Sequence, residues 1–155
     1  MGSEIERKFL VDPSLWKPRD AGTRYTQGYL SSAKERTVRV RREGERAVIT
    51  VKGPTRGVSR AEFEYPIPLA DAEAMFALCE QPLIEKVRHA EDHGGRTWEI
   101  DVFAGDNTGL VVAEVELPDE NALVDVPPWA IHEVSHDPRY YNSNLIANPY
   151  KNWRA

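Results

Sequence analysis

The chain has 155 residues, 41% of them hydrophobic, and a formal net charge of −5. This length fits a single domain with a packed core, and the sequence lacks the run of about 18 apolar residues that a membrane span needs. No apolar segment near the start has the form of a signal peptide. The only cysteine, Cys79, stands among apolar residues and cannot form an internal disulfide. We therefore expect a soluble cytoplasmic domain without a membrane partner, and the negative charge argues against nucleic acid as the main partner.

Eight segments show the alternation of residues that is typical of β-strands, with turn residues between them. The expected strands are residues 4–11, 23–30, 37–43, 46–52, 59–67, 85–92, 96–103 and 110–117. Residues 13–22 contain two prolines and a glycine and are expected to form a short helical turn and a loop. Apolar residues at helical spacing between Pro68 and Gln81 predict the clearest helix, which Pro82 ends.

The chain after Pro118 carries no long alternating segment. We expect a short helix at about 119–124, an irregular stretch at Pro127-Pro128-Trp129 and a helix from Pro138 to Leu145. No internal repeat or linker divides the sequence, so residues 1–155 are expected to form one domain.

The first expected strand carries the pattern Glu4-Ile5-Glu6-Arg7-Lys8. Because successive side chains of a strand point to opposite faces, Glu4, Glu6 and Lys8 share one face. The two carboxylates lie about 7 Å apart along the strand, so they can share a divalent cation, and the lysine can hold an anion against it. A charged, solvated strand face would give the same pattern, so this segment alone does not decide.

The same alternation recurs in seven of the expected strands, mostly as pairs of like charge two residues apart. The members of this set are Glu4, Glu6, Lys8, Arg39, Arg41, Lys52, Glu62, Glu64, Lys86, Arg88, Glu99, Asp101, Glu114 and Glu116. Six of them are positive and eight are negative, a mixture that suits a polyanion arriving with a divalent metal.

Eight mostly antiparallel strands, seven of them charged on one face, predict a closed β-barrel. We expect a mainly β fold of the α+β class, with a few short helices outside the barrel and at the C-terminus. Closure removes exposed strand edges, and a barrel of this size has room inside for one small ligand. The alternative is an open sheet whose charged face meets water. Neighbouring like charges such as Arg39 and Arg41 argue against it, because a solubility surface intersperses the two signs.

These residues carry a resemblance to a known family. Glu4-Ile5-Glu6-Arg7-Lys8 is similar to the ExExK signature of the CYTH family, also called triphosphate tunnel metalloenzymes. The likeness continues through Gln27-Gly28-Tyr29-Leu30 and the charged pairs, and reaches Arg139-Tyr140-Tyr141-Asn142. It implies an eight-stranded antiparallel barrel whose tunnel binds triphosphates. Members include inorganic tripolyphosphatases, thiamine triphosphatases and class IV adenylyl cyclases, and this compact chain most resembles the small bacterial tripolyphosphatases.

The charged residues suit hydrolysis of tripolyphosphate, which needs positioning and charge stabilisation more than covalent help. The expected substrate-binding residues, which can all donate to phosphate oxygens, are Lys8, Arg39, Arg41, Lys52, Lys86 and Arg88. The expected ligands for one or two Mg²⁺ or Mn²⁺ ions are Glu4, Glu6, Glu114 and Glu116. One ion would orient the phosphates, and a second, near Glu116 or Glu64, would carry the attacking water.

Other positions have less defined roles. Tyr29 matches a tyrosine that pairs with the motif lysine in some family hydrolases, where it assists the leaving phosphate. The expected catalytic set is therefore Lys8, Tyr29, Glu64 and Glu116. Glu99 and Asp101 are metal ligands or braces for the cationic residues, and the role of Glu62 stays open.

Two other functions would use parts of the same residue set. An adenylyl cyclase would need the same metal and phosphate groups and would also have to hold adenine, for which we identify no motif. A polyphosphate-binding module without activity would need the cations but not four metal carboxylates. No Walker A loop, zinc signature or G-x-S-x-G elbow is present in the sequence. The physiological triphosphate and the oligomeric state stay open.

Overall fold

The computed structural model describes residues 2–153, which form nine strands and a few short helices. The strands are β1 (Gly2–Val11), β2 (Thr23–Ser31), β3 (Thr37–Glu43), β4 (Arg46–Lys52), β5 (Ser59–Ile67), β6 (Ile84–His93), β7 (Arg96–Phe103), β8 (Val111–Glu116) and β9 (Ala130–Glu133). The helices are α1 (Leu69–Phe76) and α2 (Asn142–Leu145), with 3₁₀ turns η1 (Gly105–Asn107), η2 (Pro138–Tyr140) and η3 (Tyr150–Asn152). No helix among the described residues is long and apolar enough to cross a membrane.

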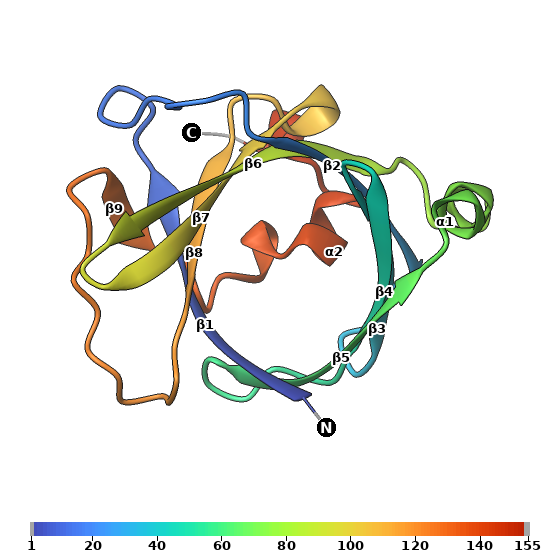
Figure 1. Cartoon of the computed structure of the whole chain (residues 1–155), viewed down its shortest axis with the longest axis horizontal. Helices are drawn as coiled ribbons and strands as arrows, with labels where there is room; N and C mark the ends of the chain where they lie inside the picture. The colour runs from blue at the N-terminus through green and yellow to red at the C-terminus, as the bar shows by residue number, and fades with distance from the viewer. Residues whose placement is uncertain (1, 154–155) are drawn as a thin grey trace.

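Eight of the strands form a closed antiparallel barrel, which Figure 1 shows end-on as a ring. The order around the ring is β5-β4-β3-β2-β6-β7-β8-β1, and residues 2–5 of β1 close the ring by pairing with β5. At the hairpin between β6 and β7, Gly94 and Gly95 have φ angles of 60° and 77°. These left-handed values suit a two-residue turn whose twist matches the strands. The predicted closed eight-stranded barrel is confirmed.

The ninth strand, β9, was not expected from the sequence. It pairs with the end of β1 outside the ring, so β1 has three neighbours. Residues 2–5 of β1 pair with β5, residues 6–10 with β8 and residues 9–11 with β9. The four residues of β9 are too few to show an alternating pattern in the sequence.

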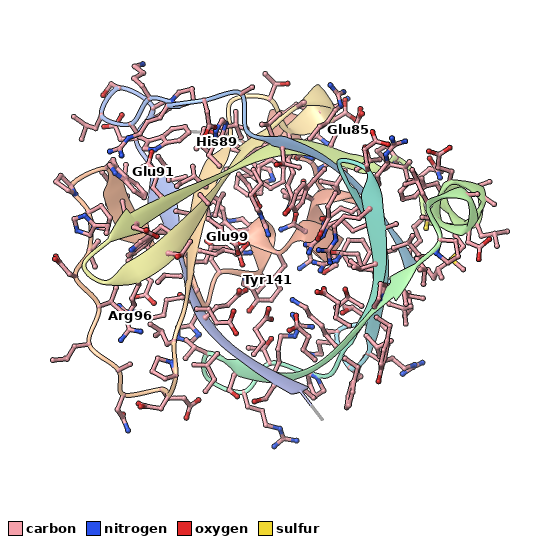
Figure 2. All side chains as sticks on the ribbon, in the orientation of Figure 1. Glu85, His89, Glu91, Arg96, Glu99 and Tyr141 are labelled. Atoms are coloured by element: carbon pink, nitrogen blue, oxygen red, sulfur yellow. The ribbon has the colours of Figure 1, made fainter. Side chains whose placement is uncertain are left out.

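The alternation along the strands places charged side chains inside the barrel. In Figure 2, Glu99 of β7 lies inside the ring, whereas Glu85, His89 and Glu91 of β6 lie outside it. The antiparallel register sets inward residues opposite one another, as with Glu99 and Glu114 on β7 and β8. The open-sheet alternative is therefore wrong.

The largest apolar cluster lies outside the barrel wall, on the opposite face of the same strands. Phe9, Trp98 and Val115 project outward from β1, β7 and β8 and are buried. Trp129, from the segment between β8 and β9, covers Trp98 with ring centres 5.8 Å apart. Trp16, in the loop that follows β1, joins the same cluster.

Toward one end of the barrel, the inward face itself becomes apolar. Leu10, Ile84, Phe103 and Val112 continue the inward face of their strands beyond the charged residues. They pack in one cluster with side chains of the C-terminal segment, Leu145 among them. The barrel interior therefore has a filled apolar end and a charged remainder.

Helix α1 covers the outside of β3 and β4 with its apolar stripe, as predicted, but it ends at Phe76 rather than Gln81. The expected extension fails because the N–H of Glu80 donates to Tyr29 O at 2.9 Å instead of continuing the helix. Cys79 is drawn against β2 at Gly28, where an added Cβ would lie 2.8 Å from that of Cys79. Gly28 permits this close approach.

Two other predicted helices are wrong in part. Residues 119–122 form a single turn and residues 122–124 have no regular structure, because the Asp119 carboxylate accepts from the backbone N–H of Asn121 at 2.8 Å and competes with helix formation. The expected helix from Pro138 to Leu145 is divided into η2 and α2 by Tyr141, whose ψ of 129° is extended. The carbonyl of Tyr140 accepts from the Lys8 ammonium at 3.2 Å rather than from a helical N–H.

Candidate active site

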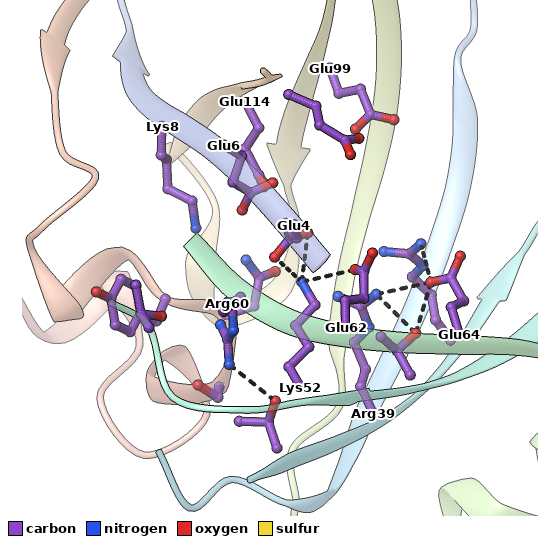
Figure 3. Close-up of a pocket in the computed structure, with 18 of the residues that line it drawn as sticks. Glu4, Glu6, Lys8, Arg39, Lys52, Arg60, Glu62, Glu64, Glu99 and Glu114 are labelled. Carbon is purple, nitrogen blue, oxygen red and sulfur yellow. Dashed lines mark hydrogen bonds and ion pairs between the residues drawn. The ribbon is translucent and has the colours of Figure 1, made fainter. Parts of the chain in front are cut away.

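The charged part of the barrel interior is a cavity of about 270 Å³, shown close up in Figure 3. Every residue expected to act in catalysis, substrate binding or metal binding lines it: Glu4, Glu6, Lys8, Tyr29, Arg39, Arg41, Lys52, Glu64, Lys86, Arg88, Glu114 and Glu116. Glu62 and Glu99 line it too, whereas Asp101 is buried in the wall.

Several lining residues were missed from the sequence. Arg60 adds a seventh cation, and Tyr141 and Asn142 come from the C-terminal segment. The signal for Arg60 was present, because it precedes Glu62 and Glu64 at the same two-residue spacing. Asn142 stands in the stretch 139–142 of the family resemblance, but no two-residue spacing marks it as a lining residue, because its place depends on contacts with Gln27 and Lys86.

One wall of the cavity, which we call the arginine wall, consists of Arg39 and Arg41 on β3 and Arg88 on β6. Glu64 lies 3.7 Å from Arg39 and 3.8 Å from Arg41. Arg41 and Arg88 both lie over the ring of Tyr25, at 4.9 and 4.8 Å from its centre. The Nε of Arg39 is buried and has no hydrogen-bond partner among residues 2–153, so it is an unsatisfied donor behind the cavity surface.

Asp101 holds two of the cations from behind the cavity surface. Its carboxylate accepts two hydrogen bonds from Arg88, at 2.7 and 2.9 Å, and lies 2.8 Å from Lys86 Nζ. Burial alone would raise the pKa of Asp101, but attraction to Lys86 and Arg88 lowers it to about 2. Burial lowers the pKa of Lys86 to about 7 against the attraction of Asp101. Asp101 is therefore a brace for cations, and Glu99, 3.4 Å from Arg88, supports the same wall.

A second wall, the carboxylate wall, consists of Glu6 on β1 and Glu114 and Glu116 on β8. These three carboxylates form no ion pair with any of residues 2–153, because the cavity cations that form ion pairs do so with other carboxylates. Burial, with repulsion from Glu114 and Glu4, raises the pKa of Glu6 well above its ordinary value. Burial would also raise the pKa of Glu114, but Lys8 and a hydrogen bond from Glu6 hold it well below. The pKa values of these two neighbouring carboxyls are therefore displaced in opposite directions, with Glu114 the stronger acid.

Glu4 does not belong to the carboxylate wall, because it binds Lys52. Lys52 Nζ donates to both of its oxygens, at 2.8 and 3.0 Å, and lies 3.5 Å from Glu62. Glu4 would have to exchange this partner to bind a metal. The three residues form the link between the two walls that is visible in Figure 3.

Lys8 stands beside the carboxylate wall, near the C-terminal segment. Burial would lower its pKa, but attraction to Glu114 and Glu6 raises it, so the ammonium is charged. Its Nζ donates to Tyr140 O and lies 5.8 Å from the centre of the Tyr141 ring. Tyr29 also lines the cavity, but among the described residues its hydroxyl accepts from Gln27 at 3.4 Å rather than bonding Lys8.

A closed barrel with an interior of matched cations and carboxylates defines a class of protein that holds a small polyanion inside a β-tunnel. The sequence matches the CYTH domain over residues 2–144, so the chain belongs to the CYTH family. It is 50% identical over 155 residues to the inorganic triphosphatase of Acetivibrio thermocellus, covering 99% of both chains. It is 35% identical over 151 residues to that of Nitrosomonas europaea, covering 92% of this chain and 96% of the relative.

The fold comparison agrees. The solved structure of the inorganic triphosphatase NE1496 superposes with a TM-score of 0.66 and 33% identity, covering 94% of this chain and 95% of that one. The family membership expected from the ExExK pattern is thus confirmed.

Proposed function

We propose that this protein is an inorganic triphosphatase that hydrolyses tripolyphosphate bound inside the barrel. The observation that carries the proposal is the cavity lining. Seven cations and seven carboxylates converge on about 270 Å³: Lys8, Arg39, Arg41, Lys52, Arg60, Lys86 and Arg88 with Glu4, Glu6, Glu62, Glu64, Glu99, Glu114 and Glu116. Such a lining suits a small, highly charged substrate that arrives with cations of its own.

The cations divide into donors with a free direction and donors held by carboxylates. Among the cations with a free direction, Lys8 and Arg60 belong to no ion pair within residues 2–153. Arg41 and Arg88 are fixed by Glu43 and Asp101, so their remaining N–H groups are pre-oriented. Pre-oriented donors stabilise charge that develops on phosphate oxygens without reorganising during the reaction.

The lining also favours an inorganic substrate over a nucleotide. Sites for organic ligands are lined mainly by apolar and aromatic side chains. Here those classes supply only Val58, Tyr29 and Tyr141 among the described lining residues. This argues against the adenylyl cyclase alternative, which needs a place for adenine.

The carboxylate wall fits a divalent metal. Glu6 and Glu114 belong to no ion pair among residues 2–153, and burial with repulsion from Glu114 and Glu4 raises the pKa of Glu6, a repulsion that a bound cation would relieve. No group of three or more acidic, histidine or cysteine side chains within residues 2–153 is already arranged as a metal cage. Proteins commonly bind Mg²⁺ through one or two carboxylates, and the substrate phosphates supply further ligands. Bound Mg²⁺ or Mn²⁺ would neutralise phosphate charge and lower the pKa of a bound water.

Four residues receive roles near the reacting bonds. Lys8 holds a phosphate oxygen beside the carboxylate wall, and Tyr29 donates its proton toward the leaving phosphate. Glu116 positions the attacking water in preference to Glu64. Glu64 accepts from Thr50 at 2.8 Å and faces two arginines, whereas Glu116 is exposed and paired in register with Glu6.

We place the protein in the cytoplasm with a small-molecule partner rather than nucleic acid or a membrane. Cys79, its one cysteine, is buried and free, as fits a reducing compartment.

The test is a phosphate-release screen of tripolyphosphate, pyrophosphate, ATP and thiamine triphosphate with Mg²⁺ or Mn²⁺, with cyclic AMP measured in the ATP reaction. We expect kcat/KM for tripolyphosphate to exceed that for pyrophosphate by at least about tenfold, because pyrophosphate forfeits one phosphate's charge-assisted contacts. Cyclic AMP formed faster than any substrate releases phosphate would replace this proposal with the cyclase. Binding of tripolyphosphate without turnover of any substrate would support a polyphosphate-binding module instead.

A further inference from the structure

Asn142, the first residue of α2, joins three segments of the cavity wall. Its Oδ1 accepts hydrogen bonds from Lys86 Nζ at 3.0 Å and from Gln27 Nε2 at 3.2 Å. Lys86 lies on β6 and Gln27 on β2, and both are buried, with 2% and 0% of their surface exposed. The C-terminal segment is thereby fixed against two strands of the barrel.

These contacts determine which way the amide of Asn142 faces. An ammonium group can only donate, so the atom of Asn142 that faces Lys86 is its oxygen. The Nδ2 group then lies on the other side of the amide carbon. It donates no hydrogen bond to any residue from 2 to 153, although Asn142 lines the cavity. Two N–H bonds are therefore free for a ligand.

Gln27 orients a second neutral donor in the same way. Its Nε2 also donates to the hydroxyl of Tyr29 at 3.4 Å, which leaves the hydroxyl proton of Tyr29 free. The side-chain amide of Gln27 thus donates to the Tyr29 hydroxyl and to the Asn142 oxygen. The hydroxyl proton of Tyr29 and the Nδ2 group of Asn142 remain available to donate to a ligand in the cavity. A ligand that meets both must present acceptors, as phosphate oxygens do.

We propose that Asn142 is a substrate-binding residue whose Nδ2 donates to a phosphate oxygen of tripolyphosphate. The inference rests on the function proposed above. The contact with Lys86 draws electron density toward the amide oxygen, so the N–H groups become stronger donors. The C-terminal segment therefore supplies part of the substrate site itself, in addition to filling one end of the barrel.

The competing explanation is that Asn142 only braces Lys86, and Asn142→Asp separates the two. Aspartate keeps an oxygen for Lys86 and Gln27 but replaces the donor with an anion. As a substrate-binding residue, Asn142→Asp lowers kcat/KM for tripolyphosphate by about a hundredfold and Asn142→Ala by about tenfold. A brace gives the opposite order, with aspartate the better substitute. Asn148→Asp, an exposed position in the same segment, controls for the added charge and should keep wild-type activity.

A double-mutant cycle tests the same point without relying on the aspartate variant to fold. If Asn142 acts only through Lys86, then Asn142→Ala costs nothing further in a Lys86→Met background. If it contacts substrate, it lowers kcat/KM by several-fold in that background as well. Melting curves of each variant show that the fold is intact.

The outcomes separate this inference from the proposed function. A wild-type protein that neither binds nor hydrolyses tripolyphosphate would overturn both. Wild-type turnover combined with aspartate activity equal to or above that of alanine would overturn the role of Asn142 alone. Weaker binding of tripolyphosphate to Asn142→Asp in EDTA, measured by calorimetry, is expected and does not depend on metal or turnover.

Discussion

On the arginine wall, Arg39, Arg41 and Arg88 each lie within 4 Å of a carboxylate, the longest of these separations being 3.8 Å. On the carboxylate wall, Glu6 and Glu114 belong to no ion pair among residues 2–153, and burial with repulsion from Glu114 and Glu4 raises the pKa of Glu6 well above its ordinary value. The arginines of the first wall are held in place by carboxylates of the protein itself. The carboxylates of the second wall have only attraction over longer distances, chiefly from Lys8. The difference indicates that the carboxylate wall is where an external cation gains the most.

The largest effect should come from removing that cation. With EDTA, turnover of tripolyphosphate should fall by at least about a hundredfold, because metal ions supply several kcal/mol of charge stabilisation in phosphoryl transfer. Readdition of Mg²⁺ or Mn²⁺ should restore it, and Ca²⁺ should support it poorly, since Ca²⁺ prefers longer bonds and more ligands. Phosphate release measured in each condition checks this. Full turnover in EDTA, or equal turnover with Ca²⁺, would mean that the carboxylate wall has another purpose.

The arginine wall can be tested with two neighbouring residues that face opposite ways. Arg41→Ala should lower kcat/KM roughly thirtyfold, because a charge-assisted contact worth about 2 kcal/mol is lost. Its melting temperature should change little. The variant loses the hydrogen bond from Arg41 to Glu43, which lowers its stability. It also removes a buried charge that Arg39 and Arg88 repel, as the lowered pKa of Arg41 indicates, and this gain in stability offsets the loss.

Arg42→Ala is the matched control for that prediction. Arg42 faces outward and pairs with Glu73 of α1 at a partly exposed site, so its loss should cost at most about 1 kcal/mol of unfolding free energy and leave kcat/KM unchanged. Equal loss of activity in both variants would trace the effect to the fold of β3. Near-normal activity of Arg41→Ala would remove it from the substrate site.

The smallest effect concerns the proton on the carboxylate wall. The folded protein raises the pKa of Glu6, so the associated stability is present below the ordinary carboxyl pKa of about 4.5 and is lost as pH rises through the raised value. In EDTA, Glu6→Gln should therefore raise the melting temperature relative to wild type by a few degrees at pH 8 and hardly at all at pH 4.

Glu133 offers a control of opposite sign. Its hydrogen bond from Arg7 lowers its pKa, so its contribution is present above the ordinary carboxyl pKa and lost at lower pH. Glu133→Gln should lower the melting temperature at pH 7 and have less effect at pH 4. A Glu6→Gln difference that is the same at both pH values would show that folding does not raise the pKa of Glu6.

Most of the barrel strands and their inward faces could be predicted from the sequence, because side chains along a strand alternate with a period of two residues. Glu4, Glu6 and Lys8 could be assigned to one face from spacing alone, and the same rule brought in Arg39 and Arg41. The spacing could not predict that Glu4 pairs with Lys52 whereas Glu6 forms no ion pair among the described residues. That distinction depends on which strands are neighbours around the ring, and strand order is not written in the spacing.

The prediction from sequence was least accurate for the C-terminal segment, where residues far apart in the chain make the deciding contacts. Pro138 to Leu145 was expected to form one helix, although its Tyr, Asn and Ser residues are weak helix formers. In the structure the Tyr140 carbonyl accepts from Lys8 and the Asn142 oxygen from Lys86, contacts that join residues 132 and 56 positions apart. The family resemblance included Asn142, but its contact with Lys86 follows only from the assembled barrel.

The threefold pairing of β1 has a consequence for synthesis of the chain. β1 is made before the other strands of the barrel, yet its partners are residues 59–62, 112–116 and 130–133. The ring therefore cannot close until residue 116 has been made, and β1 has all its partners only after residue 133. Pairing over such separations gives a high contact order, for which folding in milliseconds to seconds is typical. A chain that stops before β8 can still pair β2 to β7 with one another, but the ring then stays open between β7 and β1.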